Sequence, residues 1–214
     1  MKDSKKKFVA AALLLAAFAL WTWGVCRVDV QAIGPQGSTV GFAALNRWAH
    51  RLTGVHFSFY TLTDWLGLVP VGVCVGFGLL GLAQWVKRRR LARVDFDILV
   101  LGGFYLAVIA AYLLFEGLAL NCRPVLIDGR LEASYPSSTT LLTLCVMPTA
   151  AMQFQSRIQN GLLRRWAVGI AAAFTVFMVV GRLISGVHWL SDIIGGILLS
   201  AGLVLLYDGA SRLK

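Results

Sequence analysis

Long apolar runs separated by short polar segments make up most of this chain. Six runs are each close to the roughly 17 to 25 residues that an α-helix needs to cross a bilayer. They lie near residues 8–25, 66–86, 98–120, 139–154, 166–187 and 189–207. The sequence therefore predicts an all-α fold, a polytopic bundle of six transmembrane helices.

A different pattern occupies the connection between about residues 27 and 64. From Phe42 to Leu52, apolar residues recur at helical spacing and charged or polar residues fill the other face. We predict an amphipathic helix here, lying in the outer membrane interface. Two interpretations stay open: a surface helix that caps the bundle, or a lid beside a functional site.

Composition agrees with a membrane protein. Of the 214 residues, 58% are hydrophobic and only 14% are charged, which is too apolar for a typical soluble domain. Nothing repeats at a fixed period, and no segment is long or polar enough to form a second domain. We predict one membrane domain over residues 1–214.

The formal charge of +10 could suggest nucleic acid, but its distribution has a simpler explanation. Fourteen of the 20 Lys and Arg residues fall in the terminal segments and in alternate connections between spans. They are Lys2, Lys5, Lys6, Lys7, Lys87, Arg88, Arg89, Arg90, Arg93, Arg157, Arg164, Arg165, Arg212 and Lys214. Cytoplasmic loops carry such an excess. We expect a cell-membrane protein with both termini cytoplasmic and no nucleic-acid partner.

The N-terminal lysines and the run from Phe8 to Val25 fit either a cleaved signal peptide or an anchor. We favour an anchor, because the run is long for a signal peptide and ends in Trp21 and Trp23. It also has no convincing small-x-small cleavage site.

Four cysteines give neither metal-ligand spacing nor a disulfide framework. Cys74 and Cys145 lie inside predicted spans. Cys26 and Cys122 both lie near the outer boundary, so the topology permits a disulfide between them. We expect no metal and no other cofactor.

The chemistry of the chain concentrates near its C-terminus, in Gly-Arg-Leu-Ile-Ser-Gly-Val-His-Trp-Leu-Ser-Asp. Ionisable residues at membrane depth usually face a polar cavity and are functional. His188 and Asp192 are four residues apart, which on a helix places them on one face. A carboxylate there would fix the imidazole tautomer. With Arg182 nearby, the pattern indicates a histidine nucleophile, its orienting carboxylate and a phosphoryl-binding guanidinium.

Two further outer segments accompany this one. Glu116 and Arg123 end the third predicted span, and Ser137, Ser138 and Thr139 begin the fourth. A Ser/Thr run at a helix start can hold an oxyanion, although such residues are also ordinary N-caps. Arg123 alone would also fit a snorkelling interface residue.

With these residues in place, the chain resembles the type 2 phosphatidic acid phosphatase superfamily, membrane lipid phosphatases related to vanadium haloperoxidases. That family carries Lys-x6-Arg-Pro, Pro-Ser-x-His and Ser-Arg-x5-His-x3-Asp on a six-helix membrane core. The matching residues here are Arg123, Pro124, Pro136, Ser137, Arg182, His188 and Asp192. The resemblance implies that His188 accepts the phosphoryl group, that Asp192 orients it, and that the two arginines and Ser137 bind phosphate.

Three positions depart from the family pattern. Glu116 stands in place of its Lys, Thr139 in place of its second-motif His, and Gly181 in place of its Ser. In the family that His is expected to protonate the leaving group. Glu116, Asp128, Glu132, His50 and His56 are candidate replacements for this acid, and Glu116 is also a candidate ion-pair partner of Arg123 or Arg182.

We therefore expect a lipid phosphatase or pyrophosphatase acting at the extracytoplasmic face through a phosphohistidine. Undecaprenyl pyrophosphate, phosphatidic acid and phosphatidylglycerophosphate are all compatible lipid substrates. The alternative is a catalytically silent relative that binds or moves a phosphorylated lipid. The sequence does not indicate an oligomeric state.

Overall fold

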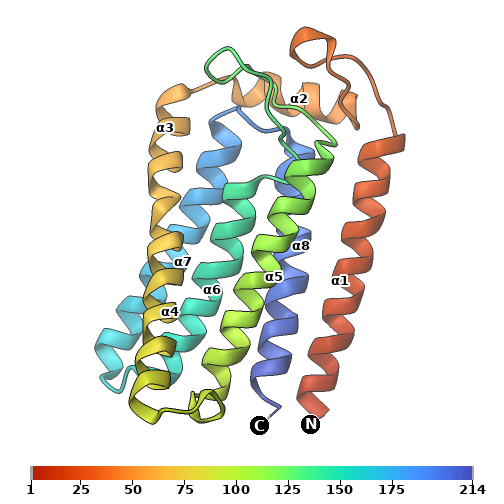
Figure 1. The fold of residues 1–214 in the computed structure, drawn as a ribbon. Coiled ribbons are helices and arrows are strands. Elements are labelled where there is room, and N and C mark those ends of the chain that lie inside the picture. The colour runs from red at the N-terminus through yellow and green to blue at the C-terminus, as the bar shows by residue number, and fades with distance from the viewer. Residues whose placement is uncertain (1, 214) are drawn as a thin grey trace.

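In the computed structural model, which describes residues 2–213, the chain forms a bundle of helices (Figure 1). The helices are α1 (Lys2–Arg27), α2 (Ala43–Thr53), α3 (Phe57–Leu66), α4 (Leu68–Arg88), α5 (Phe96–Leu118), α6 (Ser138–Arg157), α7 (Gly161–Ile184) and α8 (Leu190–Ser211). Two short 3-10 turns lie at Pro35–Gly37 and Leu91–Arg93. Residues 2–213 contain isolated β-bridges but no strand, which confirms the predicted all-α fold.

Five helical segments are long and apolar enough to cross a membrane: Asp3–Arg27, Phe57–Arg88, Phe96–Leu118, Gly161–Ile184 and Leu190–Ser211. Their outer faces expose large apolar side chains such as Trp65 and Leu106, as lipid-facing helices do. α6 does not meet this criterion, because it carries many threonines and glutamines. It packs against α7 and α8 inside the bundle, with Thr143, Thr149 and Gln153 buried. A sixth span therefore stays a prediction.

The second predicted span begins earlier than expected. Residues 57–64 were assigned to the outer connection, but they form most of α3, which continues into α4 across Gly67. The apolar run is interrupted here by Tyr60, Thr63 and Asp64. Hydropathy alone therefore does not predict this helix. Thr63 is completely buried, so α3 directs part of its polar face into the protein.

The predicted amphipathic helix is confirmed as α2, which lies across one end of the bundle (Figure 1). Asn46 ties it to α8: its side-chain nitrogen donates to Oγ of Ser191 at 2.9 Å, and its side-chain oxygen accepts from the Ser191 backbone N–H at 3.0 Å. α2 therefore caps the bundle where α8 begins. Its position relative to a membrane interface stays a prediction.

α1 is packed closely along α8. Gly202 on α8 leaves no room for a side chain, since an added Cβ would lie 2.8 Å from the side chain of Leu15. Near the capped end, Nε1 of Trp21 donates to the backbone carbonyl of Ser191 at 3.0 Å. α1 thus forms part of the same packed core as the C-terminal helices.

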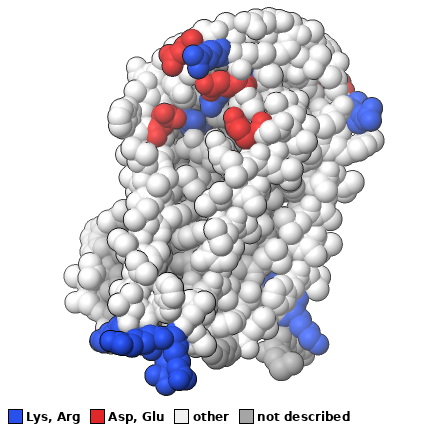
Figure 2. All heavy atoms as spheres, viewed as in Figure 1, with Lys and Arg blue, Asp and Glu red and all other residues white. Residues whose placement is uncertain are grey.

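The two ends of the bundle differ in charge. Both termini lie at the end that carries the α4–α5 connection (Figure 1), and on the face shown in Figure 2 Lys and Arg side chains gather there. Asp95 accepts hydrogen bonds at this end from Arg88 at 2.8 Å and Arg157 at 3.1 Å. These bonds hold the pKa of Asp95 down to about 2.

All four cysteines are free in this structure, so the disulfide considered between Cys26 and Cys122 is not formed.

Candidate active site

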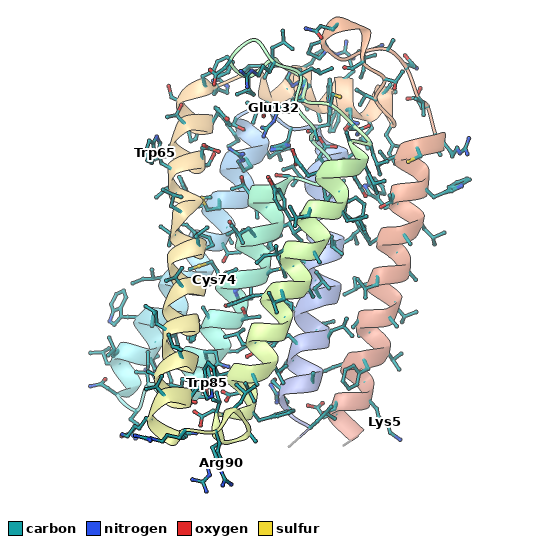
Figure 3. All side chains as sticks on the ribbon, viewed as in Figure 1. Lys5, Trp65, Cys74, Trp85, Arg90 and Glu132 are labelled. Atoms are coloured by element: carbon teal, nitrogen blue, oxygen red, sulfur yellow. The ribbon has the colours of Figure 1, made fainter. Side chains whose placement is uncertain are left out.

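Most of the predicted site residues meet at the bundle end opposite the termini, where Glu132 is labelled in Figure 3. Two irregular segments build the site. One is the loop of residues 185–189 between α7 and α8, and the other is the hairpin of residues 119–137 between α5 and α6. The hairpin is held by backbone bonds from Arg123 to Glu132 at 3.0 Å and from Ser134 to Asn121 at 2.8 Å.

His188 lies between the two sides of this hairpin and is only 3% exposed. Nε2 of its ring lies 3.4 Å from a terminal nitrogen of Arg123, and Nδ1 lies 3.0 Å from Oγ of Ser134. Burial lowers the pKa of His188 well below its usual value, and the charges of Arg123 and Arg182 lower it further, while the contact with Ser134 opposes them. The imidazole is therefore neutral at neutral pH, the form in which a ring nitrogen can act as a nucleophile.

Asp192 is completely buried in the first turn of α8. One carboxylate oxygen accepts from Oγ of Ser134 at 2.5 Å and from the Trp189 backbone N–H at 3.0 Å. The other accepts from the side chain of Asn121 at 3.1 Å. Donors from two segments thus fix the carboxylate.

The predicted direct pairing of His188 with Asp192 is wrong. α8 begins at Leu190, so His188 lies before the helix and the two residues do not share a helical face. Within residues 2–213, the two side chains are joined through the hydroxyl of Ser134 rather than directly to each other.

Two arginines converge on the site from different elements. Nε of Arg123 lies 3.0 Å from a carboxylate oxygen of Glu132. Arg182, on α7, is 1% exposed, donates to Oγ1 of Thr63 at 3.3 Å and lies 3.7 Å from Asp64. Both guanidinium groups lie over the ring of Tyr60, at 5.9 and 5.1 Å from its centroid.

Glu116 does not take the predicted role of partner to either arginine. α5 ends at Leu118, and Ala119 adopts a left-handed conformation with φ of 44°, so the chain turns before it reaches Arg123. Glu116 is exposed, whereas Arg123 pairs with Glu132 and Arg182 with Asp64. Glu116 and Arg123 therefore do not lie on one continuous helix, and the predicted ion pair of Glu116 with either arginine is wrong.

The predicted Ser/Thr run does begin a helix. Ser137 is the N-cap of α6, is fully buried, and its backbone N–H donates to the Asp192 carbonyl at 3.2 Å. Its hydroxyl makes no hydrogen bond within the described residues, and neither does that of Thr140. Ser138 and Thr139 line a cavity of about 310 Å³ whose other walls are mostly apolar residues of α4, α5 and α6.

The other candidate acids lie outside this cluster, with one exception. His50 lies against Trp189, with ring centroids 5.4 Å apart, and His56 bonds to the Thr53 carbonyl at 2.9 Å. Asp128 is exposed in the hairpin turn. The exception is Glu132, which is held in the ion pair with Arg123.

The comparisons with known proteins agree with this geometry. Residues 104–208 match the family model of the PAP2 superfamily, and they include the hairpin, α6 and the 185–189 loop. Residues 104–208 therefore belong to the PAP2 superfamily. A crystal structure of a transmembrane PAP2-type phosphatidylglycerolphosphate phosphatase from Bacillus subtilis shares its fold, with a TM-score of 0.57 and 17% sequence identity over 95% of this chain and 97% of that chain. No curated protein sequence matches significantly.

One departure from the PAP2 pattern has a direct structural reason. At Gly181, where the family has Ser, an added Cβ would lie 2.8 Å from the side-chain methyl of Thr63. Thr63 instead supplies the hydroxyl that accepts from Arg182. α3 therefore occupies the space beside Gly181 and provides a polar partner for the arginine.

Four residues of this PAP2 site were missed in the sequence: Thr63, Asp64, Asn121 and Ser134. Asp64 carries a readable signal, because it is a charged residue beside an apolar run. Asn121 and Ser134 stand two residues before Arg123 and three before Ser137, but small polar residues are common in loops. Only the hairpin register brings them to Asp192.

Proposed function

We propose that this chain is an integral membrane phosphatase that hydrolyses a lipid phosphate or pyrophosphate through a phosphohistidine on His188. The observation that carries the proposal is the environment of His188. Its neutral Nε2 faces the guanidinium of Arg123, and Nδ1 is anchored through Ser134 to Asp192.

Unused hydrogen-bond donors around His188 support binding of a phosphoryl group. Nε of Arg182 and the hydroxyl of Ser137 are buried, and neither has a hydrogen-bond partner within residues 2–213. Leaving buried polar groups unsatisfied is costly. Phosphate oxygens are good acceptors for such donors, and the uncapped first turn of α6 adds backbone N–H groups.

The chemistry follows from these positions. Nε2 of His188 attacks phosphorus, and the bond from phosphorus to the leaving oxygen breaks with its electron pair going to that oxygen. The ring becomes a cation, with its Nδ1 proton held toward Ser134. A water molecule then attacks phosphorus, and the P–N bond breaks with its electron pair returning to Nε2, which restores the neutral ring. One proton of the water stays on the released phosphate, and the other neutralises the leaving oxygen. The arginines stabilise the charge on the phosphoryl oxygens throughout.

A lipid is the substrate class that fits the surroundings. The cavity lined by Ser138 and Thr139 continues along apolar residues of α4 and α5, including Leu68 and Ile109. A phosphorylated head group at the arginines would therefore have apolar surface beside it for its tail. From the charge distribution along the chain, we place this end of the bundle on the extracytoplasmic side.

The leaving group decides which substrate is hydrolysed best. Thr139 stands at the position of the family's second-motif His, and its hydroxyl is a poor proton donor to an alkoxide. General acid catalysis typically contributes about 10²- to 10⁴-fold. A phosphate leaving group needs little such help, so we expect a pyrophosphate lipid to be hydrolysed faster than the matching monophosphate.

The test is phosphate release by the purified protein in detergent from paired lipid pyrophosphates and monophosphates. His188→Ala should abolish release, while His56→Ala, an exposed histidine outside the site, should retain it. A substrate labelled on the transferred phosphate should leave acid-labile label on the protein only when His188 is present. Full activity of His188→Ala would refute the mechanism.

A second candidate is a silent relative that binds a phosphorylated lipid without turnover. The observation in its favour is that neither Glu116 nor Thr139 makes a hydrogen bond or ion pair to the site within the described residues. This candidate predicts saturable binding of lipid phosphates that depends on Arg182, with no phosphate release from any pair.

A further inference from the structure

Ser134 contacts both His188 and Asp192 and is itself 3% exposed. Its hydroxyl oxygen lies 3.0 Å from Nδ1 of His188 and 2.5 Å from Oδ2 of Asp192. The spacing of the two residues in the sequence predicts that Asp192 orients His188 by direct contact. This chain inserts a hydroxyl group between them.

The protons in this chain of contacts can be assigned from chemistry. A serine hydroxyl has one proton, and a carboxylate is an acceptor only. The proton of Ser134 therefore points to Asp192, and its oxygen must accept a hydrogen bond from the Nδ1–H group of His188. A second contact gives the same tautomer independently. The guanidinium of Arg123 has only donors, so Nε2 beside it carries the lone pair.

One hairpin supplies the groups on both sides of the imidazole. Arg123 and Ser134 lie on its two arms, which the bonds from Arg123 to Glu132 and from Ser134 to Asn121 hold in register. Asn121 also donates to Asp192 at 3.1 Å, so the carboxylate that receives the Ser134 proton is fixed by the same hairpin. The position of Ser134 is therefore set by backbone geometry rather than by a mobile side chain.

We propose that Ser134 is a positioning residue, a hydroxyl relay through which Asp192 fixes the tautomer and orientation of His188. When Nε2 bonds to phosphorus, the Nδ1–H group of the cationic ring donates a hydrogen bond to Oγ of Ser134, and the hydroxyl of Ser134 donates a hydrogen bond to Asp192. No proton needs to leave either residue. Asp192 thus acts on the imidazole ring through Ser134, and removing either residue breaks the same relay.

This inference rests on the proposed function, so its test includes a measurement that needs no turnover. The chain has three histidines, and the imidazole ¹⁵N signals in detergent can be assigned with His50→Gln and His56→Gln. Protein without variants at Ser134 should show His188 with its proton on Nδ1. Ser134→Ala should move the proton toward Nε2, and Ser134→Thr, which keeps the hydroxyl, should restore it.

Ser200→Ala is the matched control, because Ser200 is also a buried serine on this chain but bonds only to carbonyls of its own helix. It should leave the His188 tautomer unchanged. In phosphate release, Ser134→Ala should lower kcat by about 10²- to 10⁴-fold with a smaller change in KM. Ser134→Ala combined with Asp192→Asn should be little worse than either change alone.

Two results would overturn the relay. One is a His188 that carries its proton on Nε2 in the parent protein, a measurement that depends on no variant folding. The other is a Ser134→Ala protein with an unchanged tautomer and unchanged kcat. If the tautomer responds as expected but the parent protein releases no phosphate from any lipid, the relay stands and the hydrolase proposal fails instead.

Discussion

Gly186→Ala tests how rigidly the loop that carries His188 is held. Gly186 has φ of +66°, a left-handed conformation, and it packs against the link between α2 and α3. A Cβ at this position would lie 1.9 Å from the carbonyl oxygen of Gly54, far inside contact distance. The carbonyl of the preceding residue, Ser185, accepts a hydrogen bond from the backbone N–H of His56 at 3.0 Å. This bond holds the loop of residues 185–189 against the link between α2 and α3.

Two costs follow for an alanine at Gly186. The left-handed conformation costs about 1–2 kcal/mol in any residue with a Cβ. Relief of an overlap in a well-packed region typically costs about 1–3 kcal/mol more. We expect the free energy of unfolding to fall by about 2–5 kcal/mol in total. Since His188 lies two residues further on, a displacement of about 1 Å would also lower kcat by about 100-fold.

Gly129→Ala is the matched control. Gly129 has a similar φ of +73° in the tip of the hairpin, but nothing lies within 4 Å of a Cβ built there. In Gly129→Ala, the free energy of unfolding should fall only by the conformational cost of about 1–2 kcal/mol, and the activity should be kept. SDS titration in mixed micelles would measure stability, and phosphate release would measure kcat. Equal losses of stability in the two variants would mean that the Gly54 contact yields easily and that the reasoning is wrong.

Two further predictions concern charge. Arg123→Gln should raise the pKa of His188, because it removes a positive charge that lowers this pKa. Since the neutral ring is the nucleophile, the acid limb of the kcat/KM profile should then move to higher pH. Arg130→Gln, on the exposed hairpin turn, should leave the acid limb in place. For topology, a single cysteine at Asp128 in a cysteine-free background should react with a membrane-impermeant reagent in intact cells, and one at Gln159 should not; the reverse pattern would place the site on the cytoplasmic side.

Hydropathy was enough to predict most of the fold, and its failures have physical causes. The predicted helix at Phe42–Leu52 is confirmed as α2, because its polar and apolar faces are both strong. α3 was missed because Thr63 and Asp64 break the apolar run. Thr63 and Asp64 contact Arg182, so two residues of the site lower the hydropathy of this segment, and a helix there is not predicted.

The site was predicted in part for a related reason. Motif order identified Arg123, Arg182 and His188, but spacing along a helix gave wrong partners for two carboxylates. Glu116 lies within α5, whereas Arg123 lies beyond the end of that helix, and His188 lies before the helix that holds Asp192. Spacing arguments assume that a helix continues, and a left-handed residue such as Ala119 ends it without a strong signal in the sequence.

The packing of the N-terminal half against the catalytic segment limits how the protein can be engineered. The family match begins at residue 104, yet Arg182 receives its polar partners from Thr63 and Asp64. Asn46 and Trp21 likewise hold Ser191, next to Asp192. A chimaera that carried residues 104–208 onto another PAP2 scaffold would separate the arginine from its supports. Any graft of this site should therefore move α3 and the start of α2 together with residues 104–208.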